Sequence, residues 1–470
     1  MNQKRPDTVI RSGIPRLVVA GTHSGVGKTS VMSSLCTALV RQGLKVKPYK
    51  CGPDYIDPSL HRLACGETSI NLDSWLMGSD GVLETFIRTS QGYDIAIIEG
   101  VMGYFDGASP TSATGSTAEI ADILRAPVLL VCDASGMARS YSALVRGFLS
   151  FDGGDRIVAT LANRVGSDSH AQLLQKTVPD TLVFSLKKSP ATLPERHLGL
   201  VWADQFSETS KVMKTFQETF DDSVNPTELL SLATQAPEIT HRERPRPRPS
   251  SEAVRVGVVY DDAFRFIYQD QLDLLRSSGA KLTFLSALRD HKVPEDLDGI
   301  IIPGGYPELY SKTLSENTGF RKNLLALSRK NMPIYAECGG LIYLCDQLTD
   351  LEGHTFEMTG VFSAKVTMHK KLQKMGYVEV ILNQDSIIGP EGTRFRGHQF
   401  RYSDMEIHND TDLVYRLIPK RNKSKEQPEG LTVNQTLGSY VHAHWGSNPS
   451  LARRFLENCR SFRRGEIAGA

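Results

Sequence analysis

Residues 20–30 combine a glycine-rich turn with a lysine and a threonine, directly after the apolar run Leu17–Val19. A turn of this composition between a strand and a helix is typical of a phosphate-binding loop, because its backbone N–H groups surround the phosphates. In such a loop the lysine reaches the terminal phosphates and the next hydroxyl holds Mg²⁺. The sequence therefore predicts an α/β fold that binds a nucleotide and Mg²⁺. The residues expected to bind them are Gly21, Thr22, Gly25, Gly27, Lys28, Thr29 and Ser30.

The size and charge of the chain limit its class and its partners. Its 470 residues exceed what one hydrophobic core usually holds, so we expect two or three domains. A net charge of +1 with 23% charged residues indicates neither a nucleic-acid partner nor a membrane surface. No apolar run approaches the roughly 20 residues that span a bilayer. The seven scattered cysteines and the polar N-terminus predict reduced thiols, no signal peptide and a cytoplasmic location.

Proline and charge mark a boundary near the middle of the chain. Residues 236–251 are rich in proline and arginine and cannot build a core, which is typical of a semi-rigid linker. A new apolar run begins at Val254. We therefore predict a first domain over residues 14–235, a linker over 236–253 and a second domain over 254–465.

Both halves alternate apolar runs with amphipathic stretches, which predicts parallel sheets covered by helices on both faces. In the first half the expected strands are 16–21, 45–49, 95–99, 127–132, 157–162 and 181–185, and the expected helices include 28–42, 80–90 and 140–150. In the second half the expected strands are 254–260, 281–285, 299–302 and 333–336, followed by a β-rich region over about 360–445.

Four carboxylates follow strands of the first half, where the binding sites of parallel sheets gather. Asp54 and Asp57 come after the second expected strand, Glu99 ends the third, and Asp106 follows it. An acidic residue that ends a strand beside a phosphate-binding loop is a usual Mg²⁺ ligand, because Mg²⁺ prefers hard oxygens. We expect Asp54, Glu99 and Asp106, together with Thr29, to hold the metal. The alternative for each carboxylate taken alone is a solvated turn residue.

Two further segments of the first half carry polar side chains that suit a ligand. Asn163 follows an apolar run, and its amide either reads the edge of an adenine or serves as a turn residue. In residues 193–200, Arg196 and His197 either contact carboxylates of a substrate or only cap a helix. The residues alone leave both pairs of alternatives open.

The second half contains a candidate nucleophile, Cys338. The apolar strand 333–336 leads toward it, two glycines follow it, and an apolar helix begins after them. This strand–turn–helix pattern exposes a nucleophile, because a sharp turn needs small neighbours. We expect the N-terminus of the helix to lower the pKa of the thiol. The alternative is a buried core cysteine, and other glycines and histidines of the same half argue against it.

Glycines and histidines from distant segments complete this second candidate site. Gly304 and Gly305 follow another expected strand, and their N–H groups, with that of Gly339, are expected to form an oxyanion hole. His442 and His444 alternate by two, so both side chains point to one face if the segment is a strand. One of them is the expected base for Cys338, and the residues leave the choice open.

Seven motifs occur in a fixed order along nearly the whole chain. They are Gly21–Thr29, Gly52–Pro58, Glu99–Gly107, Leu193–Leu200, Pro303–Glu308, Glu337–Gly340 and Tyr440–Asn448. Together they resemble the cobyrinic acid a,c-diamide synthase family. The first loop, with its glycine at Gly21 in place of position 22, is similar to those of dethiobiotin-synthetase-like amide-forming ATPases. The second half resembles class I glutamine amidotransferases of the cobyric-acid type, which lack the His-Pro-Glu ending of the wider class.

The resemblance implies a ligase that uses ATP, Mg²⁺ and L-glutamine to amidate the a and c side-chain carboxylates of cobyrinic acid. It implies that the second half releases ammonia from glutamine and that the first half activates a carboxylate as an acyl phosphate. Tyr55 and Asp57 are implied to position the corrinoid substrate, and a second copy of the chain is a candidate partner. Relatives often carry Glu and His where this chain has Gln399 and Arg401.

Other activities share parts of this pattern. The same chemistry acts on hydrogenobyrinic acid or nickel-sirohydrochlorin in relatives of the family. Cobyric acid synthase amidates four other carboxylates, but residues 193–200 and 442–444 resemble the a,c-diamide group more. A partitioning or maturation ATPase often carries a lysine near position 23, where this chain has His23, and it lacks a glutaminase half.

Overall fold

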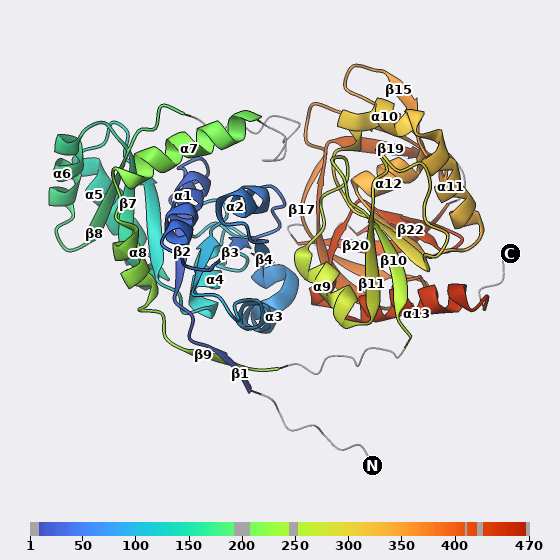
Figure 1. The fold of residues 1–470 in the computed structure, drawn as a ribbon, viewed down its shortest axis with the longest axis horizontal. Coiled ribbons are helices and arrows are strands. Elements are labelled where there is room, and N and C mark those ends of the chain that lie inside the picture. Colours follow the sequence, from blue (N-terminus) through green and yellow to red (C-terminus); the bar gives the residue numbers. More distant parts are fainter. Residues whose placement is uncertain (1–8, 192–206, 244–251, 409–410, 421–425, 467–470) are drawn as a thin grey trace, which may run out of the picture. The chain divides into compact units, whose positions relative to one another are not determined.

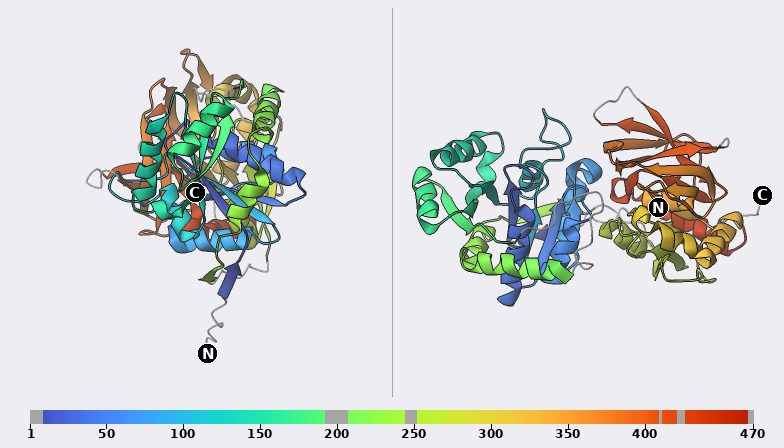
Figure 2. Two further views of the ribbon diagram at one scale, coloured as in Figure 1. Left: turned by 90° about the vertical axis from the view of Figure 1, so that its left-hand side faces the viewer. Right: turned by 90° about the horizontal axis from the view of Figure 1, so that it is seen from above.

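The chain divides by its internal contacts into two compact units, Met1–Pro245 and Arg246–Ala470. The computed structural model describes residues 9–191, 207–243, 252–408, 411–420 and 426–466. Both units are α/β, which confirms the predicted fold class (Figures 1 and 2). Among the described helices, each is too short or too polar to cross a membrane.

A seven-stranded sheet forms the centre of the first unit, and all of its neighbouring strands are parallel. Its order is β4 (Ile70–Leu72), β3 (Val46–Cys51), β5 (Ile95–Glu99), β2 (Arg16–Gly21), β6 (Val128–Asp133), β7 (Ile157–Val165) and β8 (Leu182–Lys187). The six strands expected in this half are confirmed, and β4 is additional. Since β2 and β5 are neighbours, the loop after β2 and the acidic end of β5 meet at one edge of the sheet.

Helices cover both faces of this sheet, as Figure 1 shows. One face packs against α1 (Lys28–Arg41), α7 (Ser207–Asp221) and α8 (Pro226–Ala233). The other face packs against α3 (Ser74–Thr89), α4 (Thr117–Ile123), α5 (Arg139–Ser150) and α6 (Asp168–Thr177). Because the strands are covered on both sides, they contain nearly continuous apolar runs, which is why the sequence pattern located them.

The second unit is built on a ten-stranded mixed sheet. Its parallel part is β11 (Ala280–Leu285), β10 (Val254–Val259), β12 (Gly299–Ile302), β13 (Ile334–Glu337) and β22 (Thr436–Ser439). Its antiparallel part is β21 (Gln427–Val433), β20 (Asp412–Pro419), β17 (Lys374–Leu382), β18 (Arg394–Arg401) and β23 (His442–His444). The parallel strands end at one edge, where Cys338 follows β13.

Helices and a small sheet complete the second unit. The helices are α9 (Gln269–Ser277), α10 (Ser311–Glu316), α11 (Thr318–Arg329), α12 (Gly339–Leu344) and α13 (Ser450–Arg463). The four-stranded sheet is β15 (Thr355–Glu357), β14 (Cys345–Thr349), β16 (Phe362–Met368) and β19 (Ser403–Ile407). The β-rich character predicted for the last part of the chain is confirmed by β16 to β23.

Two short strands differ from the predicted domain limits. β1 (Val9–Ser12) precedes residue 14, and it pairs antiparallel with β9 (Ile239–Arg242), which lies in the range predicted as linker. The buried guanidinium of Arg16 donates to the carbonyls of Leu124 and Pro237, both at 2.6 Å, and so holds the chain before β9 against the first unit. The first unit therefore keeps an ordered segment as far as Arg242.

Candidate active sites

The phosphate-binding loop joins β2 to α1. Gly25 (φ 84°) and Gly27 (φ 100°) adopt left-handed conformations that curl the backbone and that side chains disfavour. A Cβ atom at Gly21 would lie 2.6 Å from Val26 and 3.0 Å from Lys28, so only glycine fits where the loop folds back over the strand. This packing explains why the first glycine stands at position 21. At the next position, the N–H of Thr22 donates to the carbonyl of Val131 in β6 (3.0 Å).

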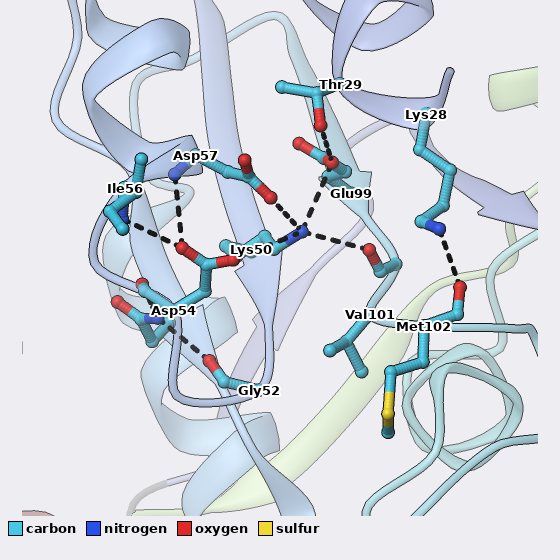
Figure 3. Close-up of polar contacts among 12 residues, drawn as sticks. Lys28, Thr29, Lys50, Gly52, Asp54, Ile56, Asp57, Glu99, Val101 and Met102 are labelled. Atoms are coloured by element: carbon cyan, nitrogen blue, oxygen red, sulfur yellow. Dashed lines mark hydrogen bonds and ion pairs between the residues drawn. The ribbon is translucent and has the colours of Figure 1, made fainter. Parts of the chain in front are cut away.

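Lys28 and Thr29 begin α1, and Ser30 follows them in the first turn (Figure 3). The ammonium of Lys28 donates to the carbonyls of Met102 (2.6 Å) and His23 (3.2 Å). The hydroxyl of Thr29 donates to Oε1 of Glu99 (2.6 Å). The loop therefore brings an ammonium group and a hydroxyl–carboxylate pair next to each other, as a bound nucleotide requires.

Lys50, which the sequence analysis did not single out, stands at the centre of the acidic residues (Figure 3). Its ammonium lies 2.6 Å from Asp57, 3.2 Å from Glu99 and 4.0 Å from Asp54, and its side chain is 3% exposed. Burial opposes the charge, but these three carboxylates raise the pKa of Lys50 above its ordinary value. The sequence contained a signal for this role, because a lysine within a strand that is buried on both faces needs negatively charged partners.

Glu99 ends β5 and is fully buried. Its Oε1 accepts from Thr29, and its Oε2 lies 2.5 Å from Nε2 of His61 in α2 (Asp57–Cys65). Burial and the neighbouring Asp57 act against ionisation, but Lys50 and His61 lower the pKa of Glu99 below its ordinary value. The carboxylate is therefore ionised. No element was predicted over residues 59–65, and His61 was not singled out from the sequence.

The remaining acidic residues have different surroundings. Oδ1 of Asp54 accepts the N–H groups of Ile56 (2.8 Å) and Asp57 (3.1 Å), which shapes the turn before α2. Asp57 is 2% exposed, and its carboxylate ion-pairs with the buried Lys50. Tyr55 lies between them and is half-buried.

Asp106 is held in the loop after β5. Its carboxylate accepts the N–H of Gly103 (2.9 Å), and a Cβ atom at Gly103 would lie 2.9 Å from the carbonyl oxygen of Thr22. Asp106 therefore stands beside the phosphate-binding loop. The structure brings Asp54, Asp57, Glu99 and Thr29 together around one lysine and leaves Asp106 exposed next to that group.

Asn163 holds the phosphate-binding loop through a hydrogen bond to its backbone. Its amide donates to the carbonyl of Val26 (2.7 Å) and accepts the N–H of Arg164 (2.9 Å), and a Cβ atom at Gly27 would overlap it. Arg164, also missed by the sequence analysis, donates to the carbonyl of Gly25 (2.8 Å) and ion-pairs with Asp133. Arg196 and His197 lie outside the described residues.

Cys338 joins β13 to α12 in a backbone conformation that is unusual for a residue with a side chain (φ 44°, ψ −102°). Its N–H donates to the carbonyl of Ser439 in β22 (2.7 Å). A Cβ atom at Gly340 would overlap the carbonyl oxygen of Ile302, and one at Gly339 would lie 2.8 Å from the nitrogen of Gly305. The glycine pair after Cys338 therefore lets the loop after β12 pack directly against the nucleophile.

The environment of Cys338 makes its thiol less acidic. Burial raises the pKa of the thiol to about 12, and the charge of Glu308 adds to the rise. The N–H of Gly339 and the charge of Arg401 act in the opposite direction but are outweighed. The expectation that the helix N-terminus lowers this pKa is wrong, because the thiol is only 7% exposed and its desolvation dominates.

His442 and His444 occupy different positions although both belong to β23. A Cβ atom at Gly304 would overlap Cε1 of His442, so this ring packs on the loop that carries the candidate oxyanion hole. Nε2 of His444 lies 3.2 Å from Asp270, and its ring contacts Tyr268 with centroids 4.8 Å apart. The geometry therefore favours His442 as the partner of Cys338.

Glu337 and His398 surround His442. The ring of His398 stacks on it with centroids 4.9 Å apart, and Oε2 of Glu337 lies 3.9 Å from its Nδ1. Oε1 of Glu337 accepts from the hydroxyl of Tyr335 (2.8 Å) and the N–H of Ala443 (3.2 Å). Burial lowers the pKa of His442 to about 3 and raises that of Glu337 to about 8. His442 is therefore a neutral imidazole at pH 7 and can accept a proton.

Comparison with known proteins identifies the family. The CobQ/CobB/MinD/ParA nucleotide binding domain model matches residues 17–197, and the CobB/CobQ-like glutamine amidotransferase domain model matches residues 255–450. A protein of Leptospira interrogans named cobyrinate a,c-diamide synthase is 45% identical over 450 residues, which cover 95% of this chain and 98% of that protein. The chain belongs to the cobyrinate a,c-diamide synthase family.

Two other members of the family are similar over the same extent. A cobyrinate a,c-diamide synthase of Syntrophotalea carbinolica is 40% identical over 453 residues, which cover 95% of this chain and 99% of that protein. A hydrogenobyrinate a,c-diamide synthase of Streptomyces coelicolor is 37% identical over 489 residues, which cover 96% of this chain and 98% of that protein. The resemblance inferred from the seven motifs is confirmed, and the two matched domains occur in the predicted order.

Proposed function

We propose that this chain is an ATP- and glutamine-dependent ligase that converts the a and c side-chain carboxylates of cobyrinic acid into amides. The observation that carries the proposal is that one chain of this family holds two complementary sites. The first is the phosphate-binding loop, with the ammonium of Lys28 held by the carbonyl of Met102 and with Thr29 in contact with Glu99. The second is the Cys338 turn packed against a glycine pair and His442. Amide synthesis from glutamine needs one site to release ammonia and another to activate the carboxylate.

The second unit supplies the glutaminase reaction in this proposal. Sγ of Cys338 attacks the amide carbon of glutamine, while His442 accepts the thiol proton and passes it to the departing ammonia. The N–H groups of Gly305 and Gly339, with that of Gly304, stabilise the oxyanion. Water then hydrolyses the thioester and releases glutamate. Because the pKa of the thiol lies far above that of His442, the proton moves only as the carbon–sulfur bond forms.

The first unit supplies carboxylate activation. Lys28 binds the terminal phosphates, and a substrate carboxylate attacks the γ-phosphate to give an acyl phosphate and ADP. Ammonia then displaces phosphate from the acyl carbon. We assign Mg²⁺ to oxygens of Thr29, Asp54, Glu99 and Asp106, since the donor set consists of hard oxygens and Thr29 already contacts Glu99. The metal would supply charge neutralisation for the phosphates.

The remaining site residues have supporting roles in this scheme. Asn163 holds the phosphate-binding loop, as its contact with Val26 indicates, and Tyr55 and Asp57 position the corrinoid substrate. We assign residues 14–235 to the ligase domain, 236–253 to the linker and 254–465 to the glutaminase domain. A second copy of the chain stays a predicted partner.

Mass spectrometry tests the function directly. The purified protein is incubated with ATP, Mg²⁺ and glutamine and, separately, with cobyrinic acid, hydrogenobyrinic acid and nickel-sirohydrochlorin. Each carboxylate that becomes an amide exchanges an oxygen for NH, and two such exchanges on cobyrinic acid are expected. Two exchanges on one of the other macrocycles instead would identify that substrate. An unchanged mass with all three, together with continued ATP hydrolysis, would overturn the proposal.

A further inference from the structure

Two half-buried side chains of opposite charge flank Cys338 and have no role in the proposed chemistry. We propose that Glu308 and Arg401 form the receptor for the α-ammonium and α-carboxylate groups of glutamine. The inference rests on the proposed glutaminase function and adds the residues that select a free amino acid over other amides.

Glu308 lies in the 3₁₀ helix Pro307–Tyr310, which begins two residues after Gly305 of the candidate oxyanion hole. A Cβ atom at Gly339 would lie 2.9 Å from Cδ of Pro307, so this turn packs against the residue after the nucleophile. Desolvation raises the pKa of Glu308 to about 7, and its charge raises the pKa of Cys338. The turn that carries Glu308 therefore lies beside the nucleophile.

The charge of Glu308 is not compensated by an ion pair among the described residues. Within the part of the chain that the structure describes, no lysine, arginine or histidine forms an ion pair with its carboxylate. A desolvated carboxylate is costly unless a cation or hydrogen-bond donors compensate it. A ligand ammonium group placed beside Cys338 supplies that compensation.

Arg401 reaches the same place from the end of β18. The carbonyl of the preceding residue, Phe400, is 3.9 Å from Sγ of Cys338. The guanidinium of Arg401 stacks on the ring of Tyr440 at 4.2 Å, which fixes its plane. Arg401 follows Phe400 directly and so belongs to the segment in contact with the nucleophile, and its charge lowers the pKa of Cys338.

The donors of Arg401 are incompletely used. Nη1 donates to the carbonyl of Ser403 (2.8 Å) and lies 3.7 Å from Asp404, whose side chain is 57% exposed. Its Nε is buried and has no hydrogen-bond partner among the described residues. A planar guanidinium with a spare donor suits a carboxylate, which it binds through charge-assisted hydrogen bonds.

Glutamine matches this pair because it carries both charges on one carbon, two methylene groups from the amide that Cys338 attacks. The negative charge of Glu308 raises the pKa of the Cys338 thiol, and binding of the glutamine ammonium group cancels that charge. Binding of the glutamine carboxylate cancels the positive charge of Arg401, which lowers that pKa, so the pair selects the substrate without a net change of charge around the sulfur. Simple amides and amide side chains within proteins lack one or both of these charges.

Substrate analogues that lack one charged group test each residue separately. Ammonia release is measured with glutamine, with glutaramate, which lacks the amino group, and with γ-aminobutyramide, which lacks the carboxylate. Glu308→Gln is expected to lower kcat/KM for glutamine about 10- to 100-fold, as loss of a charge-assisted hydrogen bond predicts, and to leave that for glutaramate unchanged. Arg401→Met is expected to lower kcat/KM for glutamine by a similar factor and to leave kcat/KM for γ-aminobutyramide unchanged.

Matched variants at exposed positions control for the chemical change itself. Glu316→Gln on α10 and Arg454→Met on α13 make the same substitutions at exposed positions and are expected to behave as wild type. If Glu308→Gln or Arg401→Met slows its truncated analogue as much as glutamine, the assignment of that residue is overturned.

The wild-type enzyme provides a test that needs no variant to fold. It should hydrolyse glutamine at least about tenfold more efficiently than either analogue, because each analogue lacks one of the two charge-assisted contacts with the receptor. Equal efficiencies for all three amides would overturn the receptor while the glutaminase function stands. Failure to release ammonia from glutamine itself would instead overturn the proposed function.

Discussion

Oε2 of Glu337 lies 3.9 Å from Nδ1 of His442, and both side chains are almost completely buried. Glu337 stands one residue before Cys338, so a single short segment carries both the nucleophile and a carboxyl group that faces the expected base. The chain lacks the His-Pro-Glu ending in which the carboxylate follows the histidine. Glu337 therefore supplies, from another part of the chain, a carboxyl group near Nδ1 of His442.

Glu337→Gln should change how the glutaminase reaction depends on pH. The pKa of Glu337 is about 8, so its carboxyl group loses a proton as the pH rises through 8 and can then stabilise an imidazolium on His442. Wild-type kcat for ammonia release should rise between about pH 7 and 9, and the variant should lose this rise and fall about tenfold below wild type at pH 9. Glutamine keeps the acceptor for Tyr335 and Ala443, so the unfolding midpoint should stay close to that of wild type.

The control for this prediction is the same pH series with ammonium salts in place of glutamine. The amidation step does not use His442 in the proposed scheme, so both proteins should respond alike. A variant whose glutaminase activity still rises over the same pH interval as wild type would show that Glu337 has no effect on His442.

The thiol of Cys338 should react with iodoacetamide mainly at alkaline pH. Burial raises its pKa to about 12, so its thiolate fraction at pH 7 is below that of free cysteine, whose pKa is about 8.5. The alkylation rate should therefore still increase about tenfold per pH unit above pH 9. Cys65 is an internal control: a hydrogen bond with Cys36 lowers its pKa to about 7, so it should react first at neutral pH. Peptide mapping by mass spectrometry gives both rates, and a plateau for Cys338 below pH 9 would contradict the buried environment.

Cys338→Ala and Lys28→Ala should separate the two reactions of the proposed scheme. Without its nucleophile the first variant should lose glutamine-dependent amidation and keep amidation supported by high ammonium, because carboxylate activation occurs at the other site. Without the ammonium group at the phosphate-binding loop the second should lose both routes. Product masses measure both activities. If ammonium does not restore Cys338→Ala, the division of labour is incorrect, and retained synthesis by Lys28→Ala would exclude that lysine from the mechanism.

The sequence located the features that depend on local pattern. The continuous apolar strands and the glycines of the two turns could be predicted because burial on both faces and tight turns each leave a local signal. Helix α2 was not predicted, since Gly52, Pro53 and Pro58 before and at its start are typical of a loop. His61 lies on this helix, so its contact with Glu99 was not predicted either.

Other features depend on residues that are distant in sequence. His442 and His444 have the same periodicity, and only their neighbours Gly304 and Asp270 distinguish them. The pKa of Cys338 was predicted in the wrong direction, because a helix N-terminus is visible in sequence whereas desolvation by packed elements is not. Lys50 was overlooked because the three carboxylates around it come from separate segments.

Lys50→Met should destabilise the first unit in a way that Mg²⁺ partly reverses. The side chain of Lys50 compensates Asp57, Glu99 and Asp54, and removing it leaves buried carboxylates without a counter-charge. The free energy of unfolding, measured with urea, should fall by about 3–5 kcal/mol, and millimolar Mg²⁺ should recover more stability in the variant than in wild type because a divalent cation can take the place of the ammonium group. The matched control is Lys214→Met, since Lys214 lies on α7 with a side chain that is 78% exposed. A loss below about 1 kcal/mol, or no difference in the response to Mg²⁺, would show that the acidic cluster does not depend on Lys50.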